Sequence, residues 1–478
     1  MKNDLRTPFQ VALFFLSLIF VFGVSSYFNP SSEISINKHF TIRTPQWKND
    51  VIEPIAVKKD DSELIERPDS LLFKIPEKKP KPIVQSYKSQ PTSFSNIRFS
   101  DFDDLRFQLL YESLRNLQME KASSKSIRIL HYGDSQIEGD RTTREIRNFF
   151  QEKYGGTGTG FQNMTPFVPM AAVAHTTEGK WVRMTSFGRQ DQRQSDGRYG
   201  VTGIANRFNS QVEGKYDAFI NFYPRSYGYK KAREFSKFQL FHGPLKDSLK
   251  ISWFINDTLN QIQFMDTLTD DSKLVVRASE PIKKLRIEFK GASPDFYGIS
   301  LDGESGVNVD NISMRGSSGI SFTQMDESHF KNELSNHEIA LIILQFGGNS
   351  VPYFKTKESV KSYGKSFKRQ IQLFKRLVPS ASILVVGPSD MASKKGLKWL
   401  SYPIIREVRN TMMNVAFDER VGYFDLCGFM GGEGSMVEWV NKSPPLAGPD
   451  HIHFTRRGAK KVGVAIANAI KQELNRYE

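Results

Sequence analysis

The chain has almost no cysteine, since Cys427 is the one cysteine among 478 residues. An intrachain disulfide is therefore excluded, and folding depends on the burial of apolar surface. The cysteine count neither requires nor excludes an oxidising compartment. No zinc-finger, RNA-recognition or arginine-rich arm pattern occurs, so we predict no nucleic-acid partner.

Long hydrophobic runs are also missing, apart from one near the N-terminus at residues 9–28. About 20 apolar residues can span a bilayer as a helix. Lys2 and Arg6 precede the run, and such a positive flank is expected to stay in the cytoplasm, which puts the rest of the chain outside. We therefore predict a transmembrane signal anchor over residues 1–30. A cleaved signal peptide is the alternative, but the run is longer than a typical signal core and no A-x-A site follows it.

Residues 31–97 lack a sustained apolar pattern. The segment EKKPKPIVQSYKSQPTSFS is rich in Lys, Pro and Ser, and this composition cannot bury enough surface to offset the entropy of ordering. We predict a flexible, disordered linker.

The formal net charge is +14. Such an excess is compatible with an anionic partner such as lipid headgroups or an acidic cell-wall polymer. Because the Lys and Arg residues are spread along the chain, we interpret the charge first as a solvated basic surface.

Strands and helices alternate in two stretches of the chain, residues 98–165 and 311–478. A buried strand is predicted at 126–132, before a turn and an amphipathic helix, and near-continuous apolar strands recur at 339–346 and 382–388. This alternation predicts an α/β domain in which helices cover both faces of a parallel sheet.

Between those stretches, residues 166–310 lose the helical pattern. Short alternating runs such as KWVRMTSF, LKISWFI and SKLVVRAS are separated by Gly, Asp, Asn and Ser. Several short strands at this spacing predict a β-sandwich, inserted into the α/β domain.

Four short segments near predicted strand ends carry candidate chemistry, and open parallel sheets place their sites at such ends. In the first, GDS, Ser135 directly follows the strand at 126–132. Its Oγ can attack an acyl carbon while its own N–H stabilises the oxyanion. Alone, such a tripeptide is more often an ordinary turn.

The next two segments offer hydrogen-bond donors. Gly319 ends the segment GSSG after a predicted strand, and glycine lets a backbone N–H approach a ligand closely. Asn349 ends the segment GGN after the strand at 339–346, and its amide can donate to a developing oxyanion. Each of them is an ordinary turn residue when taken in isolation.

The fourth segment is DHIH, ahead of the last predicted helix. His453 can accept a serine proton, and Asp450, three residues earlier, can orient it. His451 points elsewhere in that geometry, so we predict a packing or surface role for it. Two histidines and an aspartate also fit a metal site, but no further ligand cluster occurs, and we predict neither metal nor cofactor.

Together and in this order, the four segments resemble the four blocks of the SGNH, or GDSL-type, hydrolase family. The resemblance implies a flavodoxin-like three-layer α/β/α fold. It also implies a catalytic triad of Ser135, His453 and Asp450. The oxyanion would be held by the N–H groups of Ser135 and Gly319 and by the Asn349 side chain.

The sequence departs from the family pattern at several positions. Gln136 follows the serine where the name-giving pattern has Leu, and Ser350 stands where Asp is common. Neither change removes a catalytic group. A rival for Gly319 exists among Gly155, Gly156, Gly158 and Gly160, but Gly319 follows a strand and precedes Asn349 at a spacing that the family uses.

An SGNH domain split by a β-sandwich looks like the peptidoglycan O-acetylesterases of bacterial envelopes, whose insert resembles a carbohydrate-binding module. The resemblance implies a serine esterase anchored in the inner membrane, with its catalytic body in the periplasm and an acetylated polysaccharide, first of all peptidoglycan, as substrate. Aromatic residues of the insert are candidates to stack on sugar rings, although each of them more often fills a sandwich core: Trp181, Phe222, Tyr223, Tyr227, Tyr229 and Trp253.

Two other functions fit the same segments. In an O-acetyltransferase, a sugar hydroxyl replaces water as acceptor of the same acyl group, and a membrane acyl-transfer protein would be the partner. A non-catalytic cell-wall-binding protein is the other alternative, although every catalytic position is filled.

Overall fold

The computed structural model describes residues 33–37, 40–43, 96–100, 107–119, 125–210 and 214–478. The predicted signal anchor over residues 1–30 lies outside them, as does most of the predicted linker. Among the described residues, no helix is long and apolar enough to cross a membrane.

The chain divides into two units, residues 1–87 and 88–478. The first contains an antiparallel hairpin of β1 (Glu33–Asn37) and β2 (Phe40–Arg43). The prediction of an unstructured linker is therefore wrong for these two segments, whose isoleucines and threonine favour an extended backbone.

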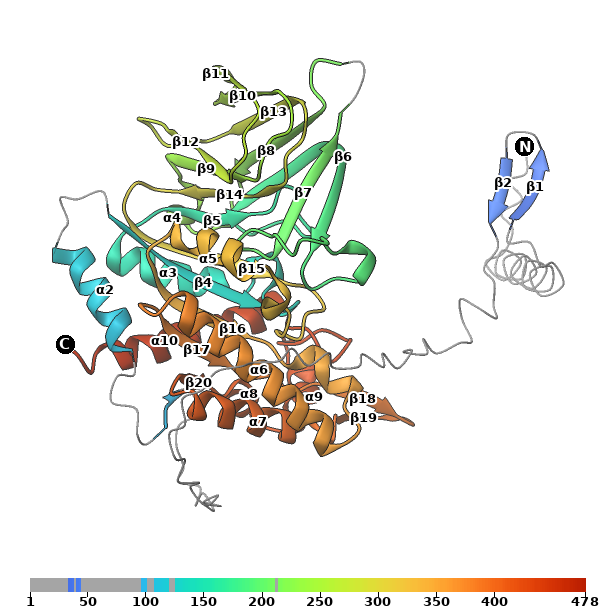
Figure 1. Cartoon of the computed structure of the whole chain (residues 1–478). Coiled ribbons are helices and arrows are strands. Elements are labelled where there is room, and N and C mark those ends of the chain that lie inside the picture. Colours follow the sequence, from blue (N-terminus) through green and yellow to red (C-terminus); the bar gives the residue numbers. More distant parts are fainter. Residues whose placement is uncertain (1–32, 38–39, 44–95, 101–106, 120–124, 211–213) are drawn as a thin grey trace, which may run out of the picture. The chain divides into compact units, whose positions relative to one another are not determined.

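The second unit contains a six-stranded sheet with helices on both faces (Figure 1). From one edge to the other, the strands are β15 (Gly306–Ser313), β4 (Ser126–Gly133), β16 (Ile339–Gln345), β17 (Ser382–Val386), β20 (Gly422–Phe424) and β3 (Ile97–Arg98). The first five are parallel, and in chain order they lie 2-1-3-4-5. That order is the flavodoxin-like one, which confirms the predicted fold of the α/β domain.

The antiparallel edge strand β3 pairs with β20. The α/β domain therefore includes Ile97, one residue before its predicted start at residue 98.

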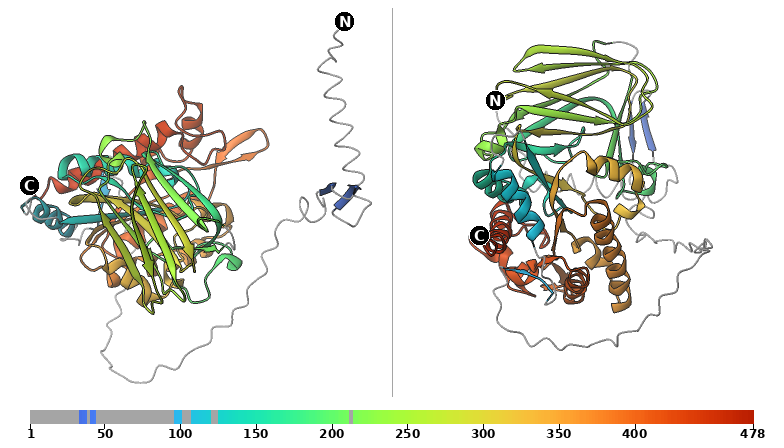
Figure 2. Two further views of the ribbon diagram at one scale, coloured as in Figure 1. Left: turned by 90° about the horizontal axis from the view of Figure 1, so that it is seen from above. Right: turned by 60° about the vertical axis from the view of Figure 1, so that its left-hand side comes forward.

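Apolar side chains of the strands point alternately to two separate cores. On one side, Ile129 and Ile343 pack with Phe150 and Ile466 under the first group of helices, α2 (Gln108–Met119), α3 (Thr143–Tyr154) and α10 (Arg456–Leu474). On the other side, Leu130 and Leu344 pack under the second group, α5 (Glu327–Ser335), α6 (Lys357–Leu377) and α7 (Ile405–Asp418). Figure 1 and the right-hand view of Figure 2 show these layers.

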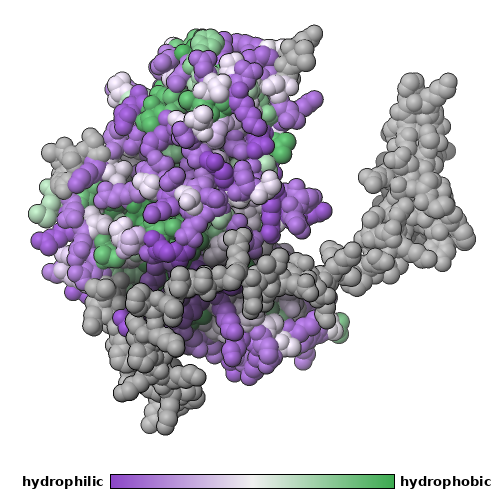
Figure 3. Space-filling model, in the orientation of Figure 1, coloured by the Kyte–Doolittle hydropathy of each residue, from purple (hydrophilic) through white to green (hydrophobic). Residues whose placement is uncertain are grey.

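Three smaller elements complete the C-terminal part: the helices α8 (Leu426–Met430) and α9 (Ser435–Asn441), and a hairpin of β18 (Ala392–Lys395) and β19 (Lys398–Ser401). Hydrophilic residues cover most of the face of the molecule drawn in Figure 3.

The insert is a β-sandwich, as predicted, and its strands form one continuous sheet that folds onto itself. Along the main path they are β11 (Thr258–Met265), β10 (Leu249–Ile255), β13 (Leu285–Gly291), β8 (Ala218–Pro224), β6 (Val173–Thr185), β7 (Ile204–Asn209), β14 (Phe296–Asp302), β9 (Lys237–His242) and β12 (Ser272–Arg277). The long strand β6 belongs to both halves, because it pairs with β8 up to Gly179 and with β7 from Lys180. Buried side chains such as Phe222, Trp253 and Phe289 fill the space between the halves.

The predicted insert boundaries, 166–310, are wrong at both ends. β5 (Gly158–Gln162) pairs with β14 and so belongs to the insert, whereas β15 pairs along its whole length with β4 of the α/β sheet. Both strands begin at a glycine, and the partner of such a strand is set by tertiary contacts that the sequence pattern does not contain.

Candidate active site

Ser135 lies at the point where the strand order of the α/β sheet reverses. The chain leaves β4, forms β15 on one side of it, and later forms β16 on the other side. The turn after β4 is tight, because a side-chain carbon on Gly133 would lie 2.9 Å from the Ile137 side chain. This crevice beyond the carboxyl ends of the strands is where α/β sheets of this order bind ligands.

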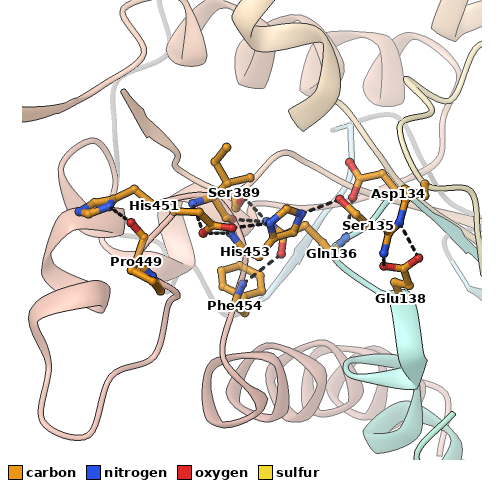
Figure 4. Close-up of polar contacts among 12 residues, drawn as sticks. Asp134, Ser135, Gln136, Glu138, Ser389, Pro449, His451, His453 and Phe454 are labelled. Carbon is orange, nitrogen blue, oxygen red and sulfur yellow. Dashed lines mark hydrogen bonds and ion pairs between the residues drawn. The ribbon is translucent and has the colours of Figure 1, made fainter. Parts of the chain in front are cut away.

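His453 lies directly against the serine. Its Nε2 is 2.8 Å from the Ser135 Oγ, although 318 residues separate the two in the sequence (Figure 4). The two groups are therefore within the distance at which an imidazole can take the hydroxyl proton.

Asp450 holds His453 from the other side of the ring. The Asp450 Oδ2 is 2.7 Å from His453 Nδ1, and its Oδ1 accepts the backbone N–H groups of Ile452 and His453, both at 3.0 Å. Burial alone would raise the pKa of Asp450, but these hydrogen bonds and the charge of His453 lower it below its ordinary value. The carboxylate therefore stays ionised and fixes the orientation of the imidazole.

His451 does not take part in this arrangement and points away from Ser135 (Figure 4). Its ring stacks on Trp399 with centroids 3.8 Å apart and planes 7° apart, and its Nδ1 lies 3.0 Å from the Pro449 carbonyl. The packing role predicted for His451 is confirmed, and the stack joins the β18–β19 hairpin to the loop that carries His453.

Of the two predicted hydrogen-bond donors, Asn349 lies in the site and Gly319 lies outside it. Asn349 lies in η5 (Gly348–Tyr353), after β16, and lines the same pocket as Ser135 and His453. The Gly319 N–H donates to Ser317 Oγ at 3.1 Å, and a side-chain carbon on Gly319 would lie 2.5 Å from the ring of Phe346. Gly319 is therefore a buried packing glycine and does not line the pocket.

Gly316, at the other end of the same GSSG segment, does line the pocket. It is exposed, and its N–H makes no hydrogen bond with any residue that the structure describes. Asn349 Nδ2 donates to the Ser317 carbonyl at 3.0 Å, which fixes the Asn349 amide beside Gly316.

Three of the four rival glycines have packing roles. Gly156 and Gly158 have positive φ and approach the backbones of Val307 and Leu301, while Gly160 lies against the side chain of Asp310. None of the four glycines from Gly155 to Gly160 lines the pocket that contains Ser135.

Two further side chains hold the Ser135 turn and the His453 loop together: Gln136, noted in the sequence only as a departure from the family pattern, and Arg141, which the sequence did not single out. Gln136 Nε2 donates to the Ile452 carbonyl at 2.6 Å, and its Oε1 accepts the Phe454 N–H at 3.4 Å. Arg141 donates to the carbonyls of Ser135 and of Phe454. Both join the serine turn to the histidine loop, so the polar residue at the family's Leu position has a structural explanation.

Asp134 is buried next to the nucleophile, 4% exposed, and its Oδ1 accepts the Gln136 N–H at 2.9 Å. Burial raises the pKa of Asp134 to about 6, against the lowering effect of that hydrogen bond.

A pocket of about 820 Å³ opens beside the triad. It is lined by residues of both domains: Ser135, Glu138, Gly139, Arg141, Arg144, Glu145, Val168, Pro169, Ala171, Tyr227, Arg315, Gly316, Asn349, His453, Arg456, Arg457 and Lys460. The insert supplies one wall, through Val168, Pro169, Ala171 and Tyr227. Within the described part of the chain, no group of three or more His, Cys, Asp or Glu residues could hold a metal ion.

The candidate sugar-stacking residues of the insert separate into two groups. Phe222 and Trp253 are buried in the sandwich core, and Trp181 and Tyr229 pack against it. Tyr223 and Tyr227 are 42% and 41% exposed, and of the six aromatic residues Tyr227 alone lines the pocket.

The chain is similar to known proteins in structure. No family model and no curated protein matches the chain. A solved structure described as a peptidoglycan O-acetylesterase in action superposes with a TM-score of 0.59 and 19% identity, and the match covers 77% of this chain and 96% of that one. The α/β fold of this chain resembles that of the SGNH hydrolases. At this level of identity, the similarity shows the fold alone.

Two acetyl xylan esterase structures match over a smaller share of this chain and with lower TM-scores. An acetyl xylan esterase matches at a TM-score of 0.27 and 15% identity, over 34% of this chain and 81% of its own. An acetyl xylan esterase from the rumen bacterium Butyrivibrio proteoclasticus matches at 0.25 and 10%, over 64% of this chain and all of its own. These two TM-scores are too low to support a conclusion about this chain.

Proposed function

We propose that the protein is an extracytoplasmic serine esterase of the SGNH type that removes O-acetyl groups from a cell-envelope glycan, with peptidoglycan as the first candidate. The observation that carries the proposal is the hydrogen-bonded chain from Ser135 through His453 to Asp450, with distances of 2.8 and 2.7 Å, beside an open pocket. These are the parts that acyl transfer through a serine ester requires.

In the proposed reaction, Ser135 Oγ attacks the acetyl carbonyl carbon while His453 Nε2 takes the hydroxyl proton. The tetrahedral intermediate collapses, the C–O bond to the sugar breaks, and His453 gives its proton to the leaving sugar oxygen. Water then attacks the acetyl-enzyme with His453 again as base, which releases acetate and restores Ser135. Asp450 stabilises the imidazolium form of His453 in both steps.

The oxyanion would be held by three donors on the ends of adjacent strands. They are the Ser135 N–H after β4, the Asn349 side chain after β16, and the Gly316 N–H after β15. We assign to Gly316 the role that the sequence resemblance gave to Gly319, because the Gly319 N–H is engaged with Ser317 Oγ. The Asn349 amide has two N–H donors, so its bond to the Ser317 carbonyl leaves one for the substrate.

The fold shared with a peptidoglycan O-acetylesterase supports the choice of glycan, and the predicted anchor supports a periplasmic location. The test is acetate release from O-acetylated peptidoglycan and from acetylated xylan at equal ester concentration. The proposal predicts faster release from peptidoglycan. Faster release from xylan would contradict the choice of glycan, and an acetylated sugar product without free acetate would identify an O-acetyltransferase.

A further inference from the structure

The pocket beside Ser135 has an excess of positive charge. Two carboxylates line it, from Glu138 and Glu145, together with six basic side chains: Arg141, Arg144, Arg315, Arg456, Arg457 and Lys460. Charges of one sign that gather in a cleft raise the local concentration of an oppositely charged ligand.

Both carboxylates are already engaged by protein groups. Arg315 donates two hydrogen bonds to Glu138, at 2.8 and 2.6 Å. Glu145 lies 3.1 Å from Arg144 Nε and also accepts the Tyr229 hydroxyl at 2.6 Å. These contacts neutralise the charges of Arg315 and Arg144, two of the six cations.

A third cation, Arg141, has a positioning role. Its guanidinium donates to the carbonyls of Ser135, Glu138 and Phe454 and so ties the serine turn to the histidine loop. The remaining three are Arg456, Arg457 and Lys460.

These three side chains lie at the start of α10, just after the catalytic histidine. All three are exposed, and none forms an ion pair with a carboxylate of any described residue. Arg456 lies 5.2 Å from the centre of the Tyr227 ring, which places it between the insert and the triad. Arg456 and Arg457 lie in the first turn of α10, where cations oppose the helix dipole, so helix stability does not account for their position.

We propose that this pocket binds an acetylated glycan that carries a carboxylate, and that Arg456, Arg457 and Lys460 pair with this carboxylate while the acetyl ester lies on Ser135. The inference rests on the proposed function, since it names the substrate class of the same site. Arginine is suited to the role, because its guanidinium can donate two parallel hydrogen bonds to one carboxylate. A neutral glycan would leave the three cations unpaired.

The test compares two esters that differ in one charge: an O-acetylated methyl glucuronoside and the same compound with its carboxylate converted to a carboxamide. The measured quantity is the ratio of kcat/KM for the carboxylate ester to kcat/KM for the carboxamide ester. The full chain is predicted to prefer the carboxylate ester, and in the triple variant R456Q/R457Q/K460Q this ratio falls roughly tenfold through a higher KM. The matched control is Lys471→Gln, which changes a lysine in the last turn of the same helix and leaves the ratio unchanged.

A second measurement needs no variant. Added sodium chloride screens exposed charges, so the ratio for the unmodified protein is predicted to fall as ionic strength rises. Hydrolysis of p-nitrophenyl acetate with no preference for the carboxylate ester would overturn this inference alone. Failure to hydrolyse any of the three esters would instead overturn the proposed function.

Discussion

At the scale of single residues, the site depends on a few side chains whose surroundings set their protonation. Asp450 is held as a carboxylate by hydrogen bonds from its own loop, so it can orient His453 without competing for the proton. Asp134, one residue before the nucleophile, has the opposite environment, because burial favours its neutral form. The pKa of Asp450 is therefore lowered and that of Asp134 is raised, although both lie near Ser135.

The raised pKa of Asp134 predicts a pH dependence of stability. Its pKa goes from 3.8 to about 6 on folding, so between these values the folded state holds a proton that the unfolded chain has lost. The stability it contributes is complete below about pH 4 and is lost as the pH rises through about 6, by up to about 3 kcal/mol. In Asp134→Asn, the fall in Tm between pH 4 and pH 7 should be smaller than in the unmodified protein. Thermal unfolding followed by circular dichroism measures it, and equal falls in the two proteins would contradict the prediction.

At the scale of elements, His453 is positioned by packing between its own loop and a hairpin. The His451 ring stacks on Trp399 of β19, and the Ala392 N–H of β18 donates to the His451 carbonyl at 3.0 Å. His451 has a φ of 56°, an unfavourable conformation for a residue with a side chain, so the contacts of the hairpin help to hold the loop.

Removal of this stack should therefore loosen His453 without touching the substrate. We expect Trp399→Ala to lower kcat for p-nitrophenyl acetate about threefold to tenfold, with KM changed less than about twofold. Leu397→Ala is the matched control, since Leu397 lies on the same hairpin and is 96% exposed. Equal kcat values for the two variants would show that the stack does not position the histidine.

Much of this arrangement could be predicted from the sequence. Some strands and one site residue could not, for physical reasons. The apolar runs at 339–346 and 382–388 are continuous because both faces of the sheet are covered, so their strands were predictable. By contrast, the sequence pattern gives no clear signal for β7 or β14, because polar residues or glycine interrupt the apolar residues of each strand.

The same limit applies within the site. Ser135, Asp450 and His453 were predictable because each has a chemistry of its own and a local motif around it. Two glycines of one GSSG segment are chemically alike, and the ring of Phe346 decides which of them is buried. The paired arginines after DHIHFT are visible in the sequence as cations at a helix start, where they oppose the helix dipole.

At the scale of the whole molecule, the insert forms part of the candidate active site. Val168, Pro169, Ala171 and Tyr227 form one wall of the pocket, while the α/β domain supplies the chemistry. Tyr227 also lies 4.8 Å from Arg225 and 5.2 Å from Arg456, measured from the ring centre to each guanidinium carbon, so its ring is held across the two domains. If the proposed function holds, the insert contacts the polymer around the acetyl ester.

This placement predicts different effects on large and small substrates. Tyr227→Ala should raise KM for O-acetylated peptidoglycan about threefold to tenfold and change KM for p-nitrophenyl acetate less than about twofold, because only the polymer reaches the wall. Tyr223→Ala is the matched control, since Tyr223 is 42% exposed on the same insert and does not line the pocket. Equal effects of both variants on the polymer would contradict a role of Tyr227 in substrate contact.

The central claim, that Ser135 is the nucleophile of an acetylesterase, is tested most directly by the rate of acetate release from p-nitrophenyl acetate. The unmodified protein should release acetate, and Ser135→Ala should lose this activity by about a thousandfold or more while keeping the same Tm. Turnover by Ser135→Ala at the rate of the unmodified protein would contradict the claim.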